Sequence, residues 1–382
     1  METTELIEII SRGEDSRHQF KENLHNQDSL AQEIIAFSNS GGGKILIGIN
    51  DKSLEVKGLS TEDIGRLNKM LSNAASQSIV PSVNPYSENI THPDGLVMVI
   101  TVLNGISKPY MDNKGVIWVK SGSDKRKATS REEIQRMFQT AGLIHGDEIP
   151  ANGISISDID LPFFERFFQK EFGETIDEQD NPLQVILENM NLAKDGIFNV
   201  AGALLFSKNL HFRLPAFNIK AVSYPGNSID EDKYIDSRDI TGKVSDMFQE
   251  IISFISINIR HRQGAKSINS TGETEIPKVV LEELIANALI HRDYFITAPI
   301  RVFVFSDRVE IISPGHLPNN LTIQNILSGN SNIRNPILAS FATKLLPYRG
   351  LGSGIRRALK AYPNIEFNDD RDGNIFIVTI KL

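Results

Sequence analysis

Residues 283–294 of the 382-residue chain read ELIANALIHRDY, and this stretch carries the strongest structural signal in the sequence. Its apolar residues have the spacing of a largely buried helix, which we expect over residues 277–290. Glu283 and Asn287 are four residues apart, so a carboxylate and a carboxamide lie on one face of that helix. A carboxylate can orient a water molecule, and a carboxamide oxygen can bind a hydrated Mg²⁺. The stretch therefore predicts a polar site on one side of an otherwise apolar helix.

Three later segments place glycines and polar groups where an anionic ligand could approach the backbone. The turn IISPGHLP at 311–318 contains Gly315, and Arg334 opens a further helix. The loop GLGSGI at 350–355 enters another helix, so bare backbone N–H groups face any anion at its start. These features predict a nucleotide site, and Asp293 extends its polar end. The residues assigned to nucleotide binding are Asn287, Asp293, Gly315, Arg334, Gly350, Gly352 and Gly354.

Taken in order, the motifs ELIANALIHRDY, IISPGHLP, IRNP and GLGSGI resemble the divergent GHKL-type (Bergerat-like) ATPase fold that gyrase and histidine kinases share. The resemblance covers about residues 277–382. It implies that Glu283 is the acid that activates water and that Asn287 ligates Mg²⁺ beside bound ATP. Ser313 stands where the wider superfamily has an Asp that reads adenine, which leaves adenine specificity and hydrolysis open. A protein-interaction scaffold with a vestigial ATPase fold is the alternative.

Composition bounds the class of protein. Hydrophobic residues make up 40% and charged residues 23%, which is typical of globular chains, and no apolar run reaches the roughly 18 residues of a transmembrane helix. Cysteine is absent, which excludes disulfides, cysteine-ligated zinc and thiol catalysis. The acidic N-terminus lacks an apolar core, so we expect no leader peptide, no membrane partner and a cytoplasmic protein. The net charge is −8, so any nucleic-acid surface must be a local patch.

The N-terminal part has its own signatures, which are EDSRHQFK at 14–21, AFSNSGGG at 36–43, IGIND at 47–51 and WVKSGS at 118–123. They resemble the Schlafen AlbA-like domain of bacterial proteins, which is often fused to such an ATPase-like domain in proteins labelled DNA-binding transcriptional regulators. NVAGALLF at 199–206 is similar to the middle region of the same proteins. A Walker A loop is excluded, because Ser38 stands where the first glycine before Gly43 is required.

We therefore expect an α/β (α+β) chain of three domains. The boundaries fall in the polar stretch 143–155 and in a Gly/Ser/Thr linker at 264–275. Residues 201–206 and 217–222 have the pattern of strands or a buried pair, and residues 241–262 that of a long amphipathic helix. The three domains are a Schlafen AlbA-like domain at 1–146, a middle α/β connecting domain at 147–275 and a GHKL-like ATPase sandwich at 276–382.

A basic segment accompanies the strand that we expect at 115–120. Five cations lie within twelve residues, and Asp124 is the only acid among them. With Trp118 nearby for stacking and backbone N–H groups in a Ser-Gly-Ser loop, the segment predicts binding to phosphates. A solvated basic loop is the alternative. The residues assigned to nucleic-acid binding are Trp118, Lys120, Lys125, Arg126, Lys127 and Arg131.

The Schlafen resemblance also raises the possibility of cleavage. Schlafens with nuclease activity use an acidic trio, and the residues here that match it are Glu14, Gln19 and Asp51. Two carboxylates can hold a divalent metal, but the neutral amide of Gln19 removes charge that the metal requires. Metal-dependent cleavage of RNA or DNA is thus an alternative to binding, and a plain solvent-facing Glu14 is another.

The sequence as a whole predicts a nucleotide-regulated nucleic-acid-binding protein of the bacterial regulator type. ATP and Mg²⁺ are the expected cofactors, and weak ATPase activity is compatible with the motifs. DNA is favoured over RNA as the partner, and two protomers are expected to grip a duplex. A metal-dependent nuclease and a scaffold are the competing classes.

Overall fold

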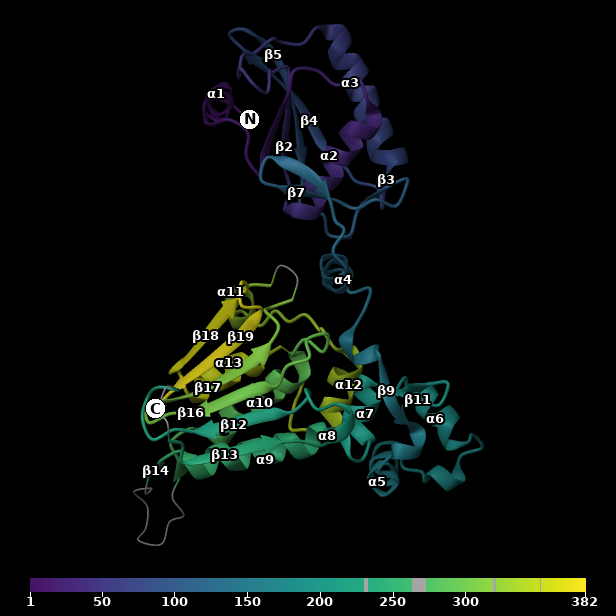
Figure 1. Ribbon diagram of the computed structural model, residues 1–382, viewed down its shortest axis with the longest axis vertical. Coiled ribbons are helices and arrows are strands. Elements are labelled where there is room, and N and C mark those ends of the chain that lie inside the picture. The colour runs from purple at the N-terminus through teal and green to yellow at the C-terminus, as the bar shows by residue number, and fades with distance from the viewer. Residues whose placement is uncertain (230–232, 263–272, 319–320, 351) are drawn as a thin grey trace. The chain divides into compact units, whose positions relative to one another are not determined.

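The computed structural model describes residues 1–229, 233–262, 273–318, 321–350 and 352–382. These residues form two compact units, Met1–Leu143 and Ile144–Leu382, and the chain is of the α+β class (Figure 1). Most of the linker expected at 264–275, and Leu351 of the glycine loop, lie outside the described residues. Within the described ranges, every helix is too short or too polar to span a bilayer.

Unit 1 alternates helices with short strands. Its elements are α1 (Thr3–Arg12), β1 (His18–Lys21), α2 (Gln27–Ser40), β2 (Gly43–Ile47), α3 (Thr61–Asn73), η1 (Ala74–Ser78), β3 (Ile79–Val80), β4 (Tyr86–His92), β5 (Gly95–Val102), β6 (Met111–Asp112), β7 (Trp118–Ser121), β8 (Asp124–Lys127) and α4 (Arg131–Thr140). The central sheet has the order β1-β2-β5-β4, with β1 and β2 parallel. Side chains alternate across β2, so Ile45 and Ile47 join the core of α2 while Leu46 joins that of α1.

The AFSNSGGG signature at 36–43 fixes the end of α2 against neighbouring strands. The Asn39 carboxamide donates to the carbonyl oxygens of Tyr110 and Trp118, both at 2.9 Å, and accepts from the Tyr110 amide at 2.9 Å. Gly41 ends the helix at φ 104°, a left-handed conformation that favours glycine. The hydrogen bonds of Asn39 and the conformation of Gly41 therefore explain these two residues of the signature without a ligand.

Unit 2 contains the remaining elements. They are η2 (Gly146–Glu148), β9 (Pro150–Ser155), η3 (Ile156–Asp158), α5 (Leu161–Phe172), η4 (Ile176–Glu178), α6 (Leu183–Asn189), β10 (Ala193–Lys194), β11 (Ile197–Asn199), α7 (Val200–Phe206), α8 (Leu210–Arg213), β12 (Ile219–Ser223), β13 (Asp236–Ile240), α9 (Val244–Asn258), β14 (His261–Arg262), β15 (Glu273–Thr274), α10 (Lys278–His291), β16 (Ile300–Val304), β17 (Arg308–Pro314), α11 (Ile323–Leu327), α12 (Pro336–Leu345), α13 (Gly354–Ala361), β18 (Ile365–Asp370) and β19 (Ile375–Lys381). The large sheet has the order β13-β12-β16-β17-β19-β18. Helices α9 and α10 pack on it, and α13 packs against α10 (Figure 1).

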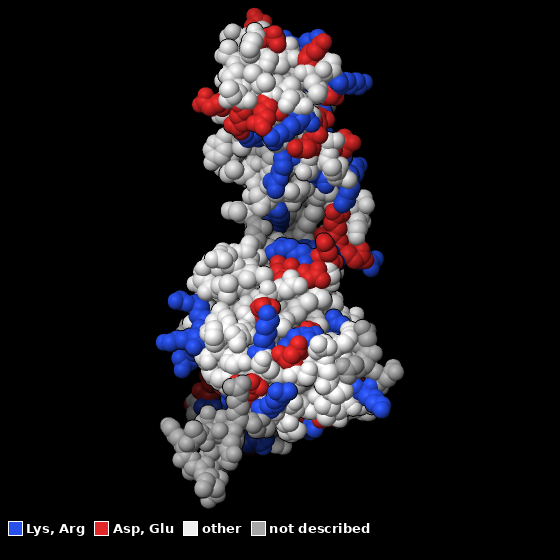
Figure 2. All heavy atoms as spheres, turned by 90° about the vertical axis from the view of Figure 1, so that its left-hand side faces the viewer, with Lys and Arg blue, Asp and Glu red and all other residues white. Residues whose placement is uncertain are grey.

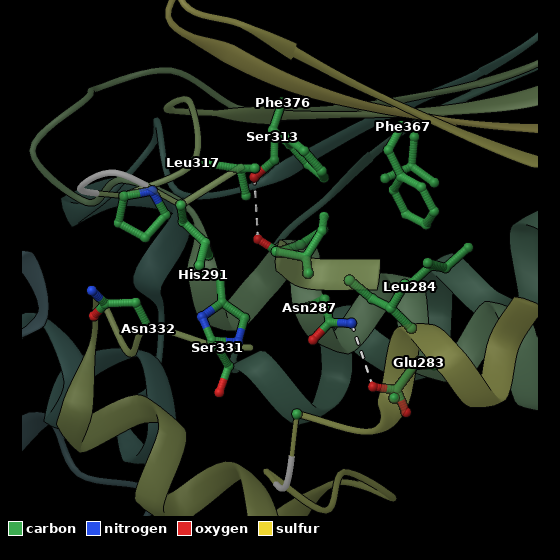
Figure 3. Close-up of a pocket in the computed structure, with 18 of the residues that line it drawn as sticks. Glu283, Leu284, Asn287, His291, Ser313, Leu317, Ser331, Asn332, Phe367 and Phe376 are labelled. Carbon is green, nitrogen blue, oxygen red and sulfur yellow. Dashed lines mark hydrogen bonds between the residues drawn. The ribbon is translucent and has the colours of Figure 1, made fainter. Parts of the chain in front are cut away.

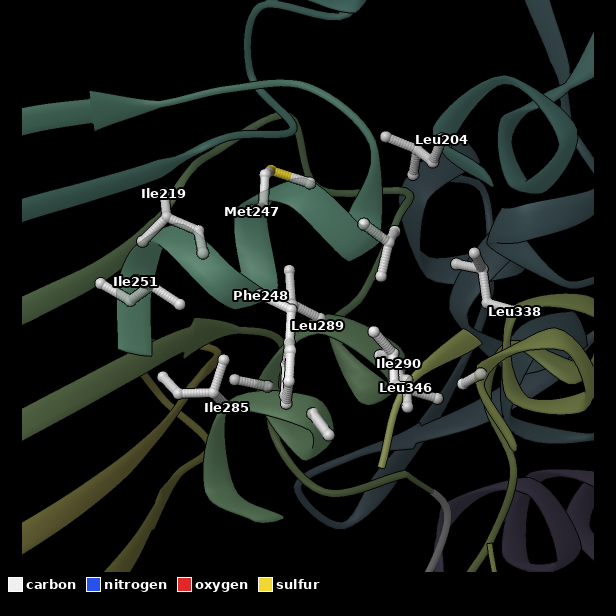
Figure 4. Packing of buried hydrophobic residues seen from close by; sticks show 14 of the residues in the cluster. Leu204, Ile219, Met247, Phe248, Ile251, Ile285, Leu289, Ile290, Leu338 and Leu346 are labelled. Atoms are coloured by element: carbon white, nitrogen blue, oxygen red, sulfur yellow. The ribbon is translucent and has the colours of Figure 1, made fainter. Parts of the chain in front are cut away.

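One hydrophobic core extends through unit 2 (Figure 4). It joins Phe248 of α9, Leu289 of α10 and Leu338 of α12, all of them almost fully buried. Burial of each such side chain contributes about 1.5–3 kcal/mol, so this core holds the layers together. It includes residues on both sides of the boundary expected at 276. The division of this region into a middle domain and a nucleotide-binding domain stays a prediction.

The segment expected as a strand at 201–206 is a helix, α7. Asn199 begins it, and its Oδ1 accepts from the Gly202 amide at 2.7 Å. All seven helical residues are buried, so the sequence lacks the polar–apolar alternation that tells a strand from a helix. The other two expectations are confirmed, since β12 overlaps 217–222 and α9 lies within 241–262.

A buried carboxylate ties the start of unit 2 to α12. Asp147 is fully buried, and its Oδ2 accepts from the Leu338 amide at 2.9 Å in the first turn of that helix. The Asn335 side chain, which precedes α12, donates instead to the carbonyl oxygens of Ile290 and Arg292 at the end of α10. Asp147 Oδ1 has no hydrogen-bond partner. Burial raises the pKa of Asp147 to about 6.

This carboxylate makes the stability of unit 2 depend on pH. Because the folded-state pKa lies above the usual 3.8, the folded state binds the proton more readily, and stability rises as the pH falls from 7 toward 4. The full shift corresponds to about 3 kcal/mol. Urea unfolding of the wild type and of Asp147→Asn at both pH values is expected to show this difference, because the amide does not titrate. Glu165→Gln, at an exposed acid on α5, is the control, and a parallel pH profile for wild type and Asp147→Asn would contradict the assignment.

Candidate functional site

A pocket opens in unit 2 between α10, the turn after β17 and the segment 348–357 (Figure 3). Its open volume is about 1040 Å³, solvent at the mouth included, which is ample for a small-molecule ligand. Apolar side chains, among them Leu317, Phe367 and Phe376, cover one part of it. The remainder carries polar side chains and the glycines at 350, 352 and 354.

The polar face of α10 borders this pocket as the four-residue spacing predicts. The Asn287 Nδ2 donates to Glu283 Oε1 at 3.4 Å (Figure 3). Glu283 is only 5% exposed, and its Oε2 accepts from Arg357 Nη2 on α13 at 2.5 Å. The expected water-activating carboxylate is therefore held in an ion pair with a side chain 74 residues further along the chain.

Gly354, the first residue of α13, lies directly on this carboxylate. A Cβ at Gly354 would be 1.5 Å from Glu283 Oε1, which is closer than any atom tolerates. The Glu283 carboxylate thus lies beside the first residue of α13, at the end of the helix where its dipole favours an anion. The sequence indicated an anion at this helix start, and the structure places a side chain of the protein there.

The turn after β17 is supported from behind by a buried arginine. Arg334 donates to the carbonyl oxygen of His316 at 2.6 Å and to that of His291 at 3.3 Å. Gly315 has φ 96°, and a Cβ there would be 2.6 Å from both Arg334 Nη1 and Asp293 Cβ. Gly315 is thus required by close packing and not only by ligand approach. Of the described residues, Gly315 borders the pocket, whereas Asp293 and Arg334 do not line it.

His291 borders the pocket and was not assigned a role from the sequence. Its Nε2 lies 3.1 Å from the hydroxyl of Tyr348. Burial, assisted by the nearby Arg334 charge, lowers the pKa of His291 to about 4, and burial raises the pKa of Tyr348 to about 12. Both side chains are therefore neutral at pH 7. The signal was available, because His291 continues the four-residue spacing of Glu283 and Asn287.

Ser313, which the GHKL resemblance matches to an adenine-reading acid, is 7% exposed at the pocket wall. Its hydroxyl donates to the Ala288 carbonyl oxygen at 3.4 Å (Figure 3). A carboxylate at this position would accept two hydrogen bonds, whereas this hydroxyl is directed to the backbone of α10. The wall thus offers no charge for recognition of a base at this point.

In unit 1 the basic segment is a hairpin, β7–β8, in which Lys120 pairs with Lys125 and Trp118 with Lys127. Lys120 donates to Gln19 Oε1 at 2.7 Å and to the Ser123 carbonyl oxygen, and burial lowers its pKa. Figure 2 shows basic and acidic side chains interspersed on the visible face. Lys120 is thus already bonded within unit 1.

Two more cations of the hairpin have acidic partners that the sequence analysis did not foresee. Lys125 pairs with Glu33, which is 5% exposed, at 2.7 Å, and Arg126 forms a two-bond ion pair with Glu133 at 2.7 and 2.9 Å. Asp124 is the only acid within the segment itself, but α2 and α4 bring further acids to the hairpin. Lys127 and Arg131 are exposed, and the Lys127 ammonium lies 5.5 Å from the Trp118 ring centre.

The three residues matched to a nuclease trio are only partly brought together. Glu14 Oε1 accepts from Gln19 Nε2 at 2.5 Å and from the Phe20 amide at 2.6 Å. Because Gln19 Oε1 already accepts from Lys120, the amide that would replace a metal-binding carboxylate is engaged on both sides. Asp51 is exposed in the turn after β2. Among the described residues, no group of three His, Asp or Glu side chains could hold a metal ion.

Two family models match the chain, one within each unit. Residues 14–129 match the family model described as "Schlafen, AlbA_2", and residues 297–378 match the model described as "Putative ATP-dependent DNA helicase recG C-terminal". The protein therefore combines a Schlafen AlbA_2 domain with a recG-C-terminal-type ATPase-like domain. The second match contains Gly315, Arg334 and the glycine loop, but it begins after α10 and so does not include Glu283 or Asn287.

Two solved structures are similar in part. The DIP2311 protein from Corynebacterium diphtheriae is 19% identical with a TM-score of 0.48, over 99% of this chain and 79% of that one. The N-terminal domain of a putative ATP-dependent DNA helicase RecG-related protein from Nitrosomonas europaea is 18% identical with a TM-score of 0.25, over 34% of this chain and 96% of that one. No curated protein matches the chain.

Proposed function

We propose that this protein binds ATP with Mg²⁺ in the unit 2 pocket, and that the bound nucleotide regulates DNA binding by unit 1, as in a transcriptional regulator. The observation that carries the proposal is the convergence of an apolar wall, the Asn287 carboxamide and the glycines of the 350–354 loop in one pocket. These parts suit the base, the metal and the phosphates of a nucleotide respectively. In this proposal unit 2 contains a GHKL-like sandwich, and two protomers hold one duplex.

The residues present fit a magnesium nucleotide. Asn287 directs its Nδ2 to Glu283, which leaves Oδ1 for a metal. No acidic cluster among the described residues competes for the ion, so Mg²⁺ would take its other ligands from phosphates and water, as it does in nucleotide sites. Bound there, the ion would neutralise phosphate charge. Arg357 also borders the pocket, where its guanidinium is paired with Glu283.

The nucleotide half of the proposal predicts a magnesium-dependent loss of affinity in Asn287→Ala. Removing the carboxamide is expected to weaken binding of ATP–Mg²⁺ at least tenfold, which is about 1.4 kcal/mol. Binding of ATP in EDTA is expected to change little, and stability without ligand to stay within about 1 kcal/mol of wild type. Isothermal titration calorimetry measures both affinities.

A thermal-shift measurement on the wild type tests whether ATP–Mg²⁺ binds at all. ATP–Mg²⁺ at about 100 times its dissociation constant is expected to stabilise unit 2 by about 2.7 kcal/mol, a rise in melting temperature of several degrees. Equal affinities of wild type and Asn287→Ala for ATP–Mg²⁺ would show that Asn287 does not ligate the metal. No thermal shift at millimolar ATP–Mg²⁺ would favour the scaffold alternative.

A further inference from the structure

Three residues that border the pocket contact one another at its polar end. Glu283, Gly354 and Arg357 all border the cavity. The Glu283 carboxylate lies against Gly354 at the start of α13 and accepts from Arg357 Nη2 at 2.5 Å. The arginine side chain is 31% exposed, whereas that of Glu283 is 5% exposed. One partner of the ion pair is therefore accessible from solvent and the other is not.

A phosphate in this pocket would need the place and the partner that Glu283 already has. The start of α13 favours one anion, because its free N–H groups and dipole are limited to the first turn. A second anion beside a buried carboxylate is repelled strongly where the surroundings exclude water. Arg357 is a planar donor that forms two-bond pairs with phosphate as readily as with carboxylate. The terminal phosphates of a nucleotide therefore compete with Glu283.

We propose that the Glu283–Arg357 ion pair is a latch that the terminal phosphates of a nucleotide open. Without nucleotide, Arg357 holds Glu283 at the start of α13. With a triphosphate bound, Arg357 donates to phosphate oxygens and releases the Glu283 carboxylate. Arg357 is thus a positioning residue for Glu283, and the latch lowers affinity for ligands with several phosphates while leaving a monophosphate unaffected. The inference rests on the proposed nucleotide site and specifies how that site distinguishes phosphate number.

The test compares AMP, ADP and ATP, each at a fixed Mg²⁺ concentration, by calorimetry on the full chain. Glu283→Gln keeps the size of the side chain and removes its charge, so the latch loses its anion. We expect Glu283→Gln to bind ATP at least tenfold more tightly than wild type, ADP with a smaller gain, and AMP with none. An equal gain for all three ligands, or no gain for ATP, would overturn the latch.

A second variant shows whether the gain depends on the arginine. Arg357→Gln is expected to weaken ATP binding, and in Glu283→Gln/Arg357→Gln most of the gain seen in Glu283→Gln should be lost. A gain of the same size with and without Arg357 would show that Glu283 only repels the phosphates and that Arg357 does not change partner. That result would overturn the latch. Arg357→Lys replaces Arg357→Gln if the latter does not fold, since it keeps the charge but loses the two-bond geometry. Absence of binding for every nucleotide to wild type would instead refute the proposed function.

Discussion

Gly354→Ala is expected to destabilise unit 2 by about 3 kcal/mol, the upper part of the range for overpacked sites. The added Cβ would be 1.5 Å from Glu283 Oε1, so the carboxylate would have to move. Because that carboxylate is buried and paired with Arg357, its movement would break the ion pair. The helix propensity of alanine offsets at most about 1 kcal/mol of this cost. Urea unfolding of unit 2, followed by circular dichroism, gives the difference in free energy of unfolding.

The cause of that loss can be isolated by removing the carboxylate. In a Glu283→Ala background the overlap disappears, and Gly354→Ala is expected to cost less than about 1 kcal/mol there, a coupling of about 2 kcal/mol. Gly65→Ala, in α3 of unit 1, is the control for a glycine-to-alanine change without overlap, because a Cβ at Gly65 meets nothing within 4 Å. Urea unfolding of unit 1 is expected to show that this change stabilises by about 0.5–1 kcal/mol. Additive effects of the Gly354 and Glu283 changes would show that the two residues do not touch.

The arrangement of Glu283 and Asn287 could be predicted because both lie on one helix, where a four-residue spacing puts two side chains on the same face. The four-residue spacing puts Glu283 and Asn287 on one face of α10, both line the pocket, and His291 continues the same spacing. Local periodicity cannot reveal Arg357, which is far along the chain and reaches Glu283 only when α13 packs on α10. Glu283 is therefore the anion of an ion pair in the structure and not a free carboxylate.

The strand expected at 201–206 was wrong, and the acidic partners of the basic hairpin could not be read from the segment, for related reasons. A fully buried segment has no polar face, so α7 could not be told from a strand by its pattern. In the hairpin the cations were visible in the sequence, but Glu33 lies on a helix 92 residues away from Lys125. The partner of a charge is a property of the fold, and a count of cations in a segment overstates those that remain for a ligand.

For the nucleic-acid half of the proposal, the two exposed cations at the hairpin are expected to contribute more than the paired ones. Each phosphate contact releases condensed counterion, so removing one lowers the magnitude of the salt slope by about one unit. Lys127→Ala/Arg131→Ala is expected to flatten the salt dependence of duplex DNA binding by up to about two units and to weaken all sequences alike. Fluorescence anisotropy across a salt series measures both the affinity and the slope.

Two other double variants separate this hairpin surface from net charge. Lys52→Ala/Lys69→Ala removes two exposed cations of unit 1 outside the hairpin and is expected to leave the slope nearly unchanged. Lys125→Ala/Arg126→Ala is expected to change the slope by less than about one unit, because Glu33 and Glu133 already neutralise both charges. Its main effect should instead be on stability, since Glu33 would be left buried without its cation. If all three variants lowered the slope equally, DNA binding would follow total charge, and β7–β8 would not be its contact surface.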